Sequence, residues 1–461
     1  MSYPPATSEL PAPTTLSRGQ CILILVVAFL GWMFAGVHMA MTGLVMRTAT
    51  TDLLPADIPE GIIGSWFGYL VCAFLLGAAT GGYLFGLVGD RLGRAKAMAL
   101  SILCYSVFSL FTYFVQTPLQ LWLLRFLTCL GIGGMWPNGI SLVSEAWPKI
   151  SRPVLAGAIG TAANVGILCF ALLTLTVLID LNSWRWTFLV GGAPLILGVY
   201  TWLVVPESPK WIAVNQQSLA SENIGKPGMG EIFSKPILKT TILGILCGTI
   251  PLFGGWGVSN WASAWSSEIG DSKKVAASSD STDGATKTAT DEQQPKSSST
   301  NSKANPTLKS WTTISRSLPG SISSLLGGFL AAYLGRKRVY FCLSLGALIC
   351  TQILFRLPSP NHEYFQLVNG CLGFFSGFFF GWLPLCLPEM FPTRLRATGA
   401  GVSFNFGRIL TAIGVLVSAF ALKELFEGQY ATVGQITGFV YALGMILVFF
   451  MPDFSPKQLD D

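Results

Sequence analysis

Long apolar runs recur from one end of this sequence to the other. A helix needs about 20 predominantly apolar residues to cross the hydrocarbon core of a bilayer, and the runs reach that length. Backbone polar groups find no water in that core, so the runs are expected to be helical. They fall at approximately 20–46, 62–88, 96–115, 119–146, 153–179, 184–205, 237–263, 308–334, 338–356, 364–387, 396–421 and 431–451.

Composition supports an all-α membrane protein with twelve transmembrane helices. The chain is 51% hydrophobic and 11% charged, whereas about a quarter of the residues in a soluble protein are charged. The net charge of +6 comes from basic residues between the apolar runs, which argues against a nucleic-acid partner. All ten cysteines lie in apolar segments, so neither a disulfide framework nor a zinc site is indicated. No cofactor and no metal is expected.

The runs form two groups of six, as two pseudo-symmetric six-helix bundles would. The first run, from about Cys21 to Met46, is too long for the core of a signal peptide and predicts a retained helix. A Ser/Thr/Lys/Asp tract within the second group is too polar to bury a core. The predicted parts are a disordered tail at 1–19, a bundle at 20–205, a linker at 206–236, a bundle at 237–451 with a disordered loop at about 266–307, and a tail at 452–461.

The basic residues predict the orientation in the membrane. An even number of spans puts both termini on one side, and the side richer in Lys and Arg is cytoplasmic. Sixteen Lys and Arg residues flank the terminal side, against four on the other, or ten with the lysines of the polar tract. Both termini of this multi-pass protein are therefore expected in the cytoplasm, in the plasma membrane or a bacterial inner membrane, with the loop at 266–307 outside.

Two motifs occur once in each group of six runs. The first follows the second run and recurs after the eighth, with an offset of 242 residues; it comprises Gly86, Asp90, Arg91, Gly93 and Arg94, then Gly328, Gly335 and Arg336. A tight turn needs glycine, and an acidic group near a helix N-terminus is favoured. The second, with an offset of 244, comprises Glu145 and Arg152, then Glu389 and Arg396. Two repeats of six spans run parallel, related by an axis along the membrane normal.

With these motifs the chain resembles the major facilitator superfamily over nearly its whole length. The stretches Arg125–Pro137 and Pro206–Trp211 are similar to the sugar and organic-acid porters. The stretches 254–261 and 389–401 are more similar to carboxylate symporters, including sialic-acid permeases. Ala95 departs from the pattern, which is usually basic there, and Ala332 replaces the second aspartate. The paired glutamines of helix 7 in sugar porters are also missing.

The resemblance implies a transporter that works by alternating access, with cytoplasmic gates formed by the loop charges. The gating residues implied are Gly86, Asp90, Arg91, Gly93, Arg94, Glu145, Arg152, Arg336, Glu389 and Arg396. Residues of the first half would latch against counterparts in the second. The alternative is that these residues are interfacial and only obey the positive-inside rule.

Three arginines lie inside predicted spans, where no carboxylate is available to neutralise them. A charge at the centre of a membrane helix costs at least about 2.5 kcal/mol, so unpaired ones require an explanation. We expect Arg408, and with it Arg316, to bind an anionic substrate, because a guanidinium group suits a carboxylate. Arg125 is a further candidate. The alternative is that Arg125 and Arg316 extend to the interface or bond to helix carbonyls.

His38 is the other ionisable group deep in a span, cysteines and tyrosines apart. It stands where aromatic-acid symporters carry an Asp-Gly-aromatic-Asp motif, and both aspartates are missing here. Histidine titrates in a useful range and is a candidate for proton coupling, although a hydrogen-bonded packing role is an alternative. Amides and indoles orient polar ligands. The further substrate-binding candidates are Asn138, Trp256, Asn260, Trp382 and Asn405.

The function expected is secondary active transport of a small organic anion with a proton, by a chain that works as a monomer. A neutral-sugar carrier of the same fold is the alternative within transport. A non-transporting nutrient receptor is the alternative of another class. A membrane enzyme is not expected, because no nucleophile–base pair, paired carboxylates or metal-ligand cluster occurs within the runs.

Overall fold

The computed structural model describes residues 16–147, 152–213, 229–279, 307–391 and 396–451, and the regular structure in these ranges is helical. The first six runs give α1 (Arg18–Leu44) with α2 (Met46–Leu53), α3 (Glu60–Leu92), α4 (Arg94–Thr112), α5 (Pro118–Ala146), α6 (Arg152–Thr176), and α7 (Trp186–Gly192) with α8 (Leu195–Val204). The short 3-10 helix η1 (Met229–Phe233) follows. The last six give α10 (Lys235–Phe253) with the π-helix η2 (Gly254–Val258) and α11 (Ser259–Ser279), α12 (Leu308–Leu334), α13 (Arg336–Leu354), α14 (Phe365–Glu389), α15 (Arg396–Glu424), and α16 (Tyr430–Gly438) with α17 (Val440–Leu447) and η4 (Val448–Phe450).

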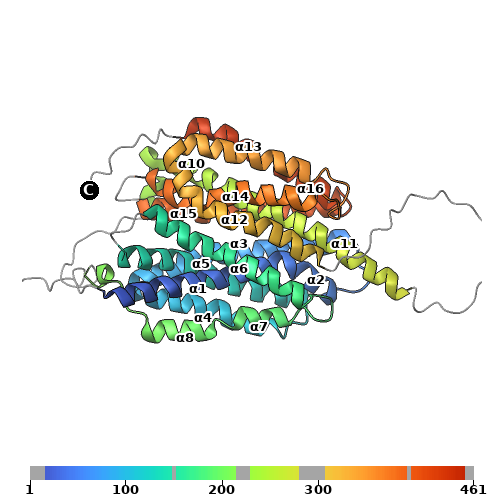
Figure 1. The fold of residues 1–461 in the computed structure, drawn as a ribbon, viewed down its shortest axis with the longest axis horizontal. Helices are drawn as coiled ribbons and strands as arrows, with labels where there is room; N and C mark the ends of the chain where they lie inside the picture. The colour runs from blue at the N-terminus through green and yellow to red at the C-terminus, as the bar shows by residue number, and fades with distance from the viewer. Residues whose placement is uncertain (1–15, 148–151, 214–228, 280–306, 392–395, 452–461) are drawn as a thin grey trace, which may run out of the picture.

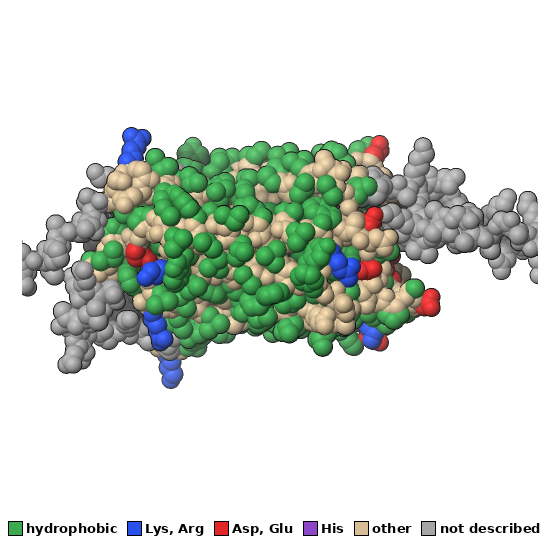
Figure 2. Space-filling view, turned by 90° about the horizontal axis from the view of Figure 1, so that it is seen from below, with side chains coloured by type: hydrophobic (Ala, Val, Ile, Leu, Met, Phe, Trp, Pro, Cys, Tyr) green, Lys and Arg blue, Asp and Glu red, His purple; other side chains and the backbone are tan. Residues whose placement is uncertain are grey.

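On the face seen in Figure 2, apolar side chains cover the middle of the molecule, and charged side chains gather at its two ends. Eleven helical spans among the described residues are long and apolar enough to cross a membrane. They confirm the predicted all-α membrane protein. The eighth predicted span, 308–334, corresponds to α12 and is not among the eleven. It carries Lys309, Arg316 and six serines, which lower its apolarity.

The helices run roughly along one axis (Figure 1). We call α1–α8 the first half and α10–η4 the second half. The described chain begins and ends at one end of the bundle, the proximal end, whereas α2, α11 and α16 lie at the opposite, distal end (Figure 1). The halves meet along α3 with α15 and along α6 with α12. Thr174 of α6 and Ser310 of α12 share a hydrogen bond of 2.8 Å, and Ser65 of α3 donates to the carbonyl of Ala419 on α15 at 3.3 Å.

Glycines allow α3 and α5 to approach closely. A side chain at Gly81 would collide with the carbonyl group of Leu130, and one at Gly133 with the carbonyl group of Ala78. Small residues at such crossings let helix backbones pack tightly in membranes. The close crossing fixes the position of α5, and therefore of Arg125, relative to α3.

The turns of the repeated motif have the backbone that the glycines predict. Gly93 has φ 105° between α3 and α4, and Gly335 has φ 91° between α12 and α13. Residues other than glycine rarely adopt such angles, since their Cβ clashes with the backbone. The same turn chemistry therefore occurs once in each half.

Three predicted boundaries need correction or lie outside the description. The tract predicted as coil from residue 266 is helical as far as Ser279, because α11 continues through it; residues 280–306 lie outside the described ranges. The first helix begins at Arg18, two residues earlier than predicted, because Ser17 and Gln20 form a capping box. Of the tails, residues 1–15 and 452–461 lie outside the described ranges.

Candidate functional site

Arg125 of α5 is a buried cation with two nitrogens that no group of the described residues satisfies. Its side chain is 2% exposed. Nη2 donates to the carbonyl oxygen of His38 at 2.7 Å and to Oγ1 of Thr42 at 2.5 Å. Nε and Nη1 are buried and have no hydrogen-bond partner in the described part of the chain. The guanidinium carbon lies 5.5 Å from the ring centroid of Phe74, whose π-cloud attracts a cation.

Arg408 of α15 crosses from the second half to the first. Its Nη1 donates to the carbonyl oxygen of Ala78 on α3 at 3.0 Å and to Oδ1 of Asn405 at 3.2 Å. The guanidinium carbon lies 4.7 Å from the ring centroid of Phe404. The side chain is 7% exposed, so the charge is held away from solvent between the halves.

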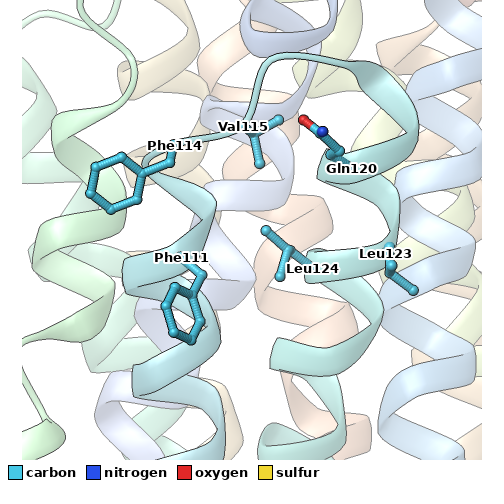
Figure 3. Close-up of a pocket in the computed structure, with 6 residues that line it drawn as sticks. All are labelled: Phe111, Phe114, Val115, Gln120, Leu123 and Leu124. Carbon is cyan, nitrogen blue, oxygen red and sulfur yellow. The ribbon is translucent and has the colours of Figure 1, made fainter.

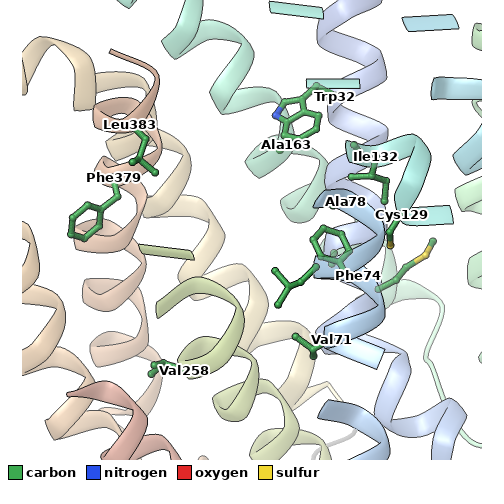
Figure 4. Close-up of a cluster of buried hydrophobic side chains, with 14 of the residues drawn as sticks. Trp32, Val71, Phe74, Ala78, Cys129, Ile132, Ala163, Val258, Phe379 and Leu383 are labelled. Carbon is green, nitrogen blue, oxygen red and sulfur yellow. The ribbon is translucent and has the colours of Figure 1, made fainter. Parts of the chain in front are cut away.

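The two guanidinium groups belong to one region of the core. Their partners Phe74 and Ala78 are four residues apart on α3, a rise of about 6 Å in a helix. Cys129, one turn beyond Arg125 on α5, lies within electrostatic range of both arginines. Figure 4 shows Cys129 beside Ala78, with Phe74 further along α3. We call Arg125, Arg408, Cys129, Phe74 and Ala78 the central site.

The π-helix η2 brings an aromatic side chain from the second half to the central site. Trp256 stacks on Phe74, with ring centroids 4.0 Å apart and an interplanar angle of 25°. A π-helix is frequent at functional sites, and here Pro251 lies just before it. Asn260 donates from Nδ2 to the carbonyl oxygen of Trp256 at 2.9 Å, so this amide supports η2.

Arg316 of α12 lies on the other side of η2. Its Nη2 contacts the carbonyl oxygen of Gly255 at 3.5 Å, a long hydrogen bond. Tyr441 of α17 is within electrostatic range, and its buried hydroxyl has no partner among the described residues. Arg316 is thus a third, half-buried cation, which contacts η2 next to the central site.

The ring of His38 packs within the first half. Its Nε2 lies 3.0 Å from the carbonyl oxygen of Gly191 on α7, and Nδ1 is buried without a partner in the described part. The ring of Tyr105 packs against it edge-on, at 5.4 Å between centroids. The backbone carbonyl of His38 accepts a hydrogen bond from Arg125, and the ring is close enough to that arginine to interact with it electrostatically.

Two of the predicted substrate-binding residues make packing contacts away from the central site. Asn138 donates from Nδ2 to the carbonyl oxygens of Phe85 at 3.0 Å and Gly134 at 2.9 Å. Trp382 is fully buried and donates to the carbonyl oxygen of Arg336 at 3.0 Å. These bonds join α3 to α5 and α14 to α13. By contrast, Asn405 faces Arg408 at the central site.

At the proximal end, the repeated motif of the first half binds a residue that sequence reasoning did not single out. Arg94 donates from Nη1 to Oδ1 of Asp90 at 2.6 Å. The N–H groups of Arg94 and Ala95, at the start of α4, donate to the carboxylate of Glu207 at 2.8 to 3.2 Å. An anion at a helix N-terminus is stabilising, and Glu207 fills that role rather than Asp90. The Pro-Glu-Ser-Pro stretch around Glu207 was the available signal.

The other predicted gating residues fall into three groups. Arg336 and Glu389, both in the second half, form a two-bond ion pair with both N···O distances at 3.2 Å. Glu145 has a buried Oε2 without a partner in the described part, and Arg91 is exposed. The side chains of Arg152 and Arg396 lie outside the description. The bonds described at this end stay within one half, so a latch across the halves remains a prediction here.

At the distal end, polar bonds do join the halves. Arg47 donates to both carboxylate oxygens of Glu60, at 3.1 and 2.8 Å. Tyr430 of α16 donates to Glu60 Oε1 at 2.7 Å, and Lys309 of α12 donates to Oγ1 of Thr48 at 2.9 Å. We call these five residues the distal latch. Sequence reasoning missed it, because Arg47 was counted only as a loop charge and the partners of Glu60 are far away in sequence.

A shallow apolar groove opens near the distal ends of α4 and α5 (Figure 3). It is lined by Phe111, Phe114, Val115, Gln120, Leu123 and Leu124. It has no charged side chain and lies apart from the arginines, so it does not resemble a site for an anion.

Comparisons with known proteins agree with this architecture. A family model described as Major Facilitator Superfamily matches residues 21–282 and 295–460. The chain is 26% identical over 399 residues to the cis,cis-muconate transport protein of Acinetobacter baylyi, covering 85% of this chain and 86% of the relative. It is 23% identical over 381 residues to a sialic acid transporter of Escherichia coli, covering 82% of each.

Among solved structures, the xylose transporter of E. coli in a partially occluded inward open conformation is similar to this one. The TM-score is 0.69 at 17% sequence identity, with 96% of this chain and 100% of the other covered. At that identity the likeness concerns the fold.

Proposed function

The chain belongs to the major facilitator superfamily, and on that premise we propose that it carries a small organic anion across the membrane by alternating access, in symport with a proton. Membership makes it a multi-pass membrane transporter of small molecules and not an enzyme. The anion proposed is a carboxylate, such as a sialic acid or an aromatic acid.

The observation that carries the proposal is Arg408, a buried guanidinium that reaches from one half to the other. Neither Arg408 nor Arg125 is paired with a carboxylate of the described residues. A buried charge is costly unless it is paired, and a carboxylate substrate would supply the missing partner. A neutral sugar would leave both cations unpaired, which favours the anion over the alternative substrate.

The names of two relatives support the same class of substrate. The Acinetobacter protein is a muconate transporter and the Escherichia protein a sialic acid transporter, and both substrates carry carboxylates. The bonds of the distal latch support a conformation in which the halves meet at the distal end. With both termini in the cytoplasm, as the positive-inside rule predicts, the central site would then face inward.

We propose that the two predicted bundles, 20–205 and 237–451, rock against each other around the central site, and that His38 couples this motion to a proton. The carbonyl oxygen of His38 accepts a hydrogen bond from Arg125. A change of charge on the His38 ring would therefore act directly beside a substrate-binding cation. The charged loops at the proximal end, including the pairs Asp90–Arg94 and Arg336–Glu389, would form the second gate.

The experiment measures accumulation of labelled sialate, aromatic carboxylates and neutral hexoses in cells that lack organic-acid uptake, with and without a protonophore. Carboxylate accumulation that the protonophore abolishes is the expected result. Arg408→Ala should abolish it at an unchanged level of protein in the membrane. Arg356→Ala is the matched control, because Arg356 is exposed and bonds only to Gln352 in the described part. Uptake restricted to hexoses, or untouched by Arg408→Ala, would contradict the proposal.

A further inference from the structure

From the charge and spacing of the central site we infer that the preferred substrate is a dicarboxylate whose two carboxylates stand about one helical turn apart. The inference rests on the proposed function, since it names the substrate class of the same site.

The unpaired positive charges of the central site indicate how many negative charges its ligand carries. Arg125 and Arg408 are 2% and 7% exposed, and each bonds only to carbonyl, hydroxyl or amide oxygens of the described residues. Those groups are dipoles, so the central site keeps two whole positive charges, apart from that of Arg316, which contacts η2 instead. Arg125 in addition keeps Nε and Nη1 without any partner. A ligand with one negative charge neutralises one of the two positive charges of the central site, whereas a dianion neutralises both.

The spacing distinguishes two separate carboxylates from one compact dianion. Arg125 lies over Phe74 and Arg408 bonds to Ala78, one turn further along α3, which corresponds to a rise of about 6 Å. A phosphate or sulfate concentrates its charge on one centre and would leave one guanidinium distant. A ligand with a carboxylate at each end meets both.

The surface between the cations is aromatic. Arg125 lies over Phe74, which stacks on Trp256, and Arg408 lies over Phe404. Aromatic surroundings favour a flat, apolar linker over a hydroxylated one. A benzene ring with carboxylates in para positions combines the charge, the spacing and the linker. The same ring with adjacent carboxylates has the charge and lacks the spacing.

The test uses the purified full-length chain in detergent and four labelled probes: terephthalate, its monomethyl ester, phthalate and benzoate. We expect terephthalate to bind about tenfold to a hundredfold more tightly than the monomethyl ester, the range for one additional charge-assisted contact. Phthalate should bind more weakly than terephthalate despite its equal charge. These comparisons need no variant, so they stand even where a substitution impairs folding.

Two variants assign the contacts. Arg125→Gln and Arg408→Gln should each bring terephthalate down to the affinity of the monomethyl ester, and Arg356→Gln should leave all four affinities unchanged. Equal binding of terephthalate and its monoester would overturn the inference while leaving carboxylate transport standing. Equal binding of phthalate and terephthalate would overturn the spacing argument. No binding of any probe, with hexoses bound instead, would remove the proposed function and the inference with it.

Discussion

Loss of the Tyr430 hydroxyl should open the distal end of the transporter. Tyr430 donates to Glu60 at 2.7 Å across the boundary between the halves, and the bond must break when the halves separate there. A hydrogen bond to a charged group contributes about 1.5–3 kcal/mol. Tyr430→Phe removes that bond and leaves the pairing of Arg47 with Glu60 intact. The ratio of open to closed distal ends should therefore rise about tenfold to a hundredfold.

The assay is the labelling rate of a cysteine placed behind the latch. Ser267 of α11 is 1% exposed and its hydroxyl has no partner in the described part of the chain, so Ser267→Cys should be tolerated. A membrane-impermeant maleimide applied from the distal side reaches this thiol only when the distal end opens. The parent chain without Ser267→Cys corrects for its ten native cysteines.

Tyr441→Phe is the matched control, because it removes a buried hydroxyl that has no partner among the described residues. It should leave the labelling rate unchanged. An unchanged rate in Tyr430→Phe would refute the assignment of the latch. Equal acceleration in both variants would mean that any change of a buried tyrosine loosens the bundle, and would also refute it.

Three further predictions concern the proton, a helix end and a helix crossing. His38→Gln should still bind substrate in detergent and lose accumulation driven by a pH gradient; accumulation equal to the parent would exclude coupling through His38. Glu207→Gln removes the charge at the start of α4 and should cost about 0.3–2 kcal/mol, seen as a lower unfolding temperature in detergent. Glu363→Gln, at an exposed position, is the control. In Gly81→Val the new side chain should collide with the carbonyl group of Leu130 and lower the stability of the fold by about 1–3 kcal/mol or more. The measurement is loss of monodisperse protein on size exclusion. Gly86→Ala, with open space around it, should behave like the parent.

The membrane spans and the turns of the motif were predictable because their causes are local. Length and apolarity decide whether a segment crosses a bilayer. The turns at Gly93 and Gly335 need a positive φ, and glycine is the residue that adopts it readily. The helical extension to Ser279 was not predictable in this way. Residues 270–279 are polar, and their helix continues from α11, which is fixed by packing against α12 and α16.

The site was predictable in its cations and not in their partners. An arginine within an apolar run is visible in the sequence, and Arg125 and Arg408 do lie buried in the core, with Arg316 half-buried. The partners come from tertiary packing: Arg408 bonds to a residue 330 positions away and Tyr430 to one 370 positions away. Asn138 and Trp382 were selected by residue type alone, and that criterion does not distinguish an amide or indole in a site from one that joins two helices.

The π-helix η2 makes the function of this chain sensitive to its length at one point. A π-helix of this kind corresponds to one residue more than a regular α-helix holds. Deletion of a single glycine from Gly254–Val258 would leave an apolar helix that still spans the membrane. It would also remove the π-helix, so the flanking helices would keep their register while Trp256 lost the displaced position that η2 gives it. A one-residue deletion at this position would therefore preserve a folded membrane protein while separating Trp256 from Phe74. Such a deletion would disable transport more selectively than most substitutions.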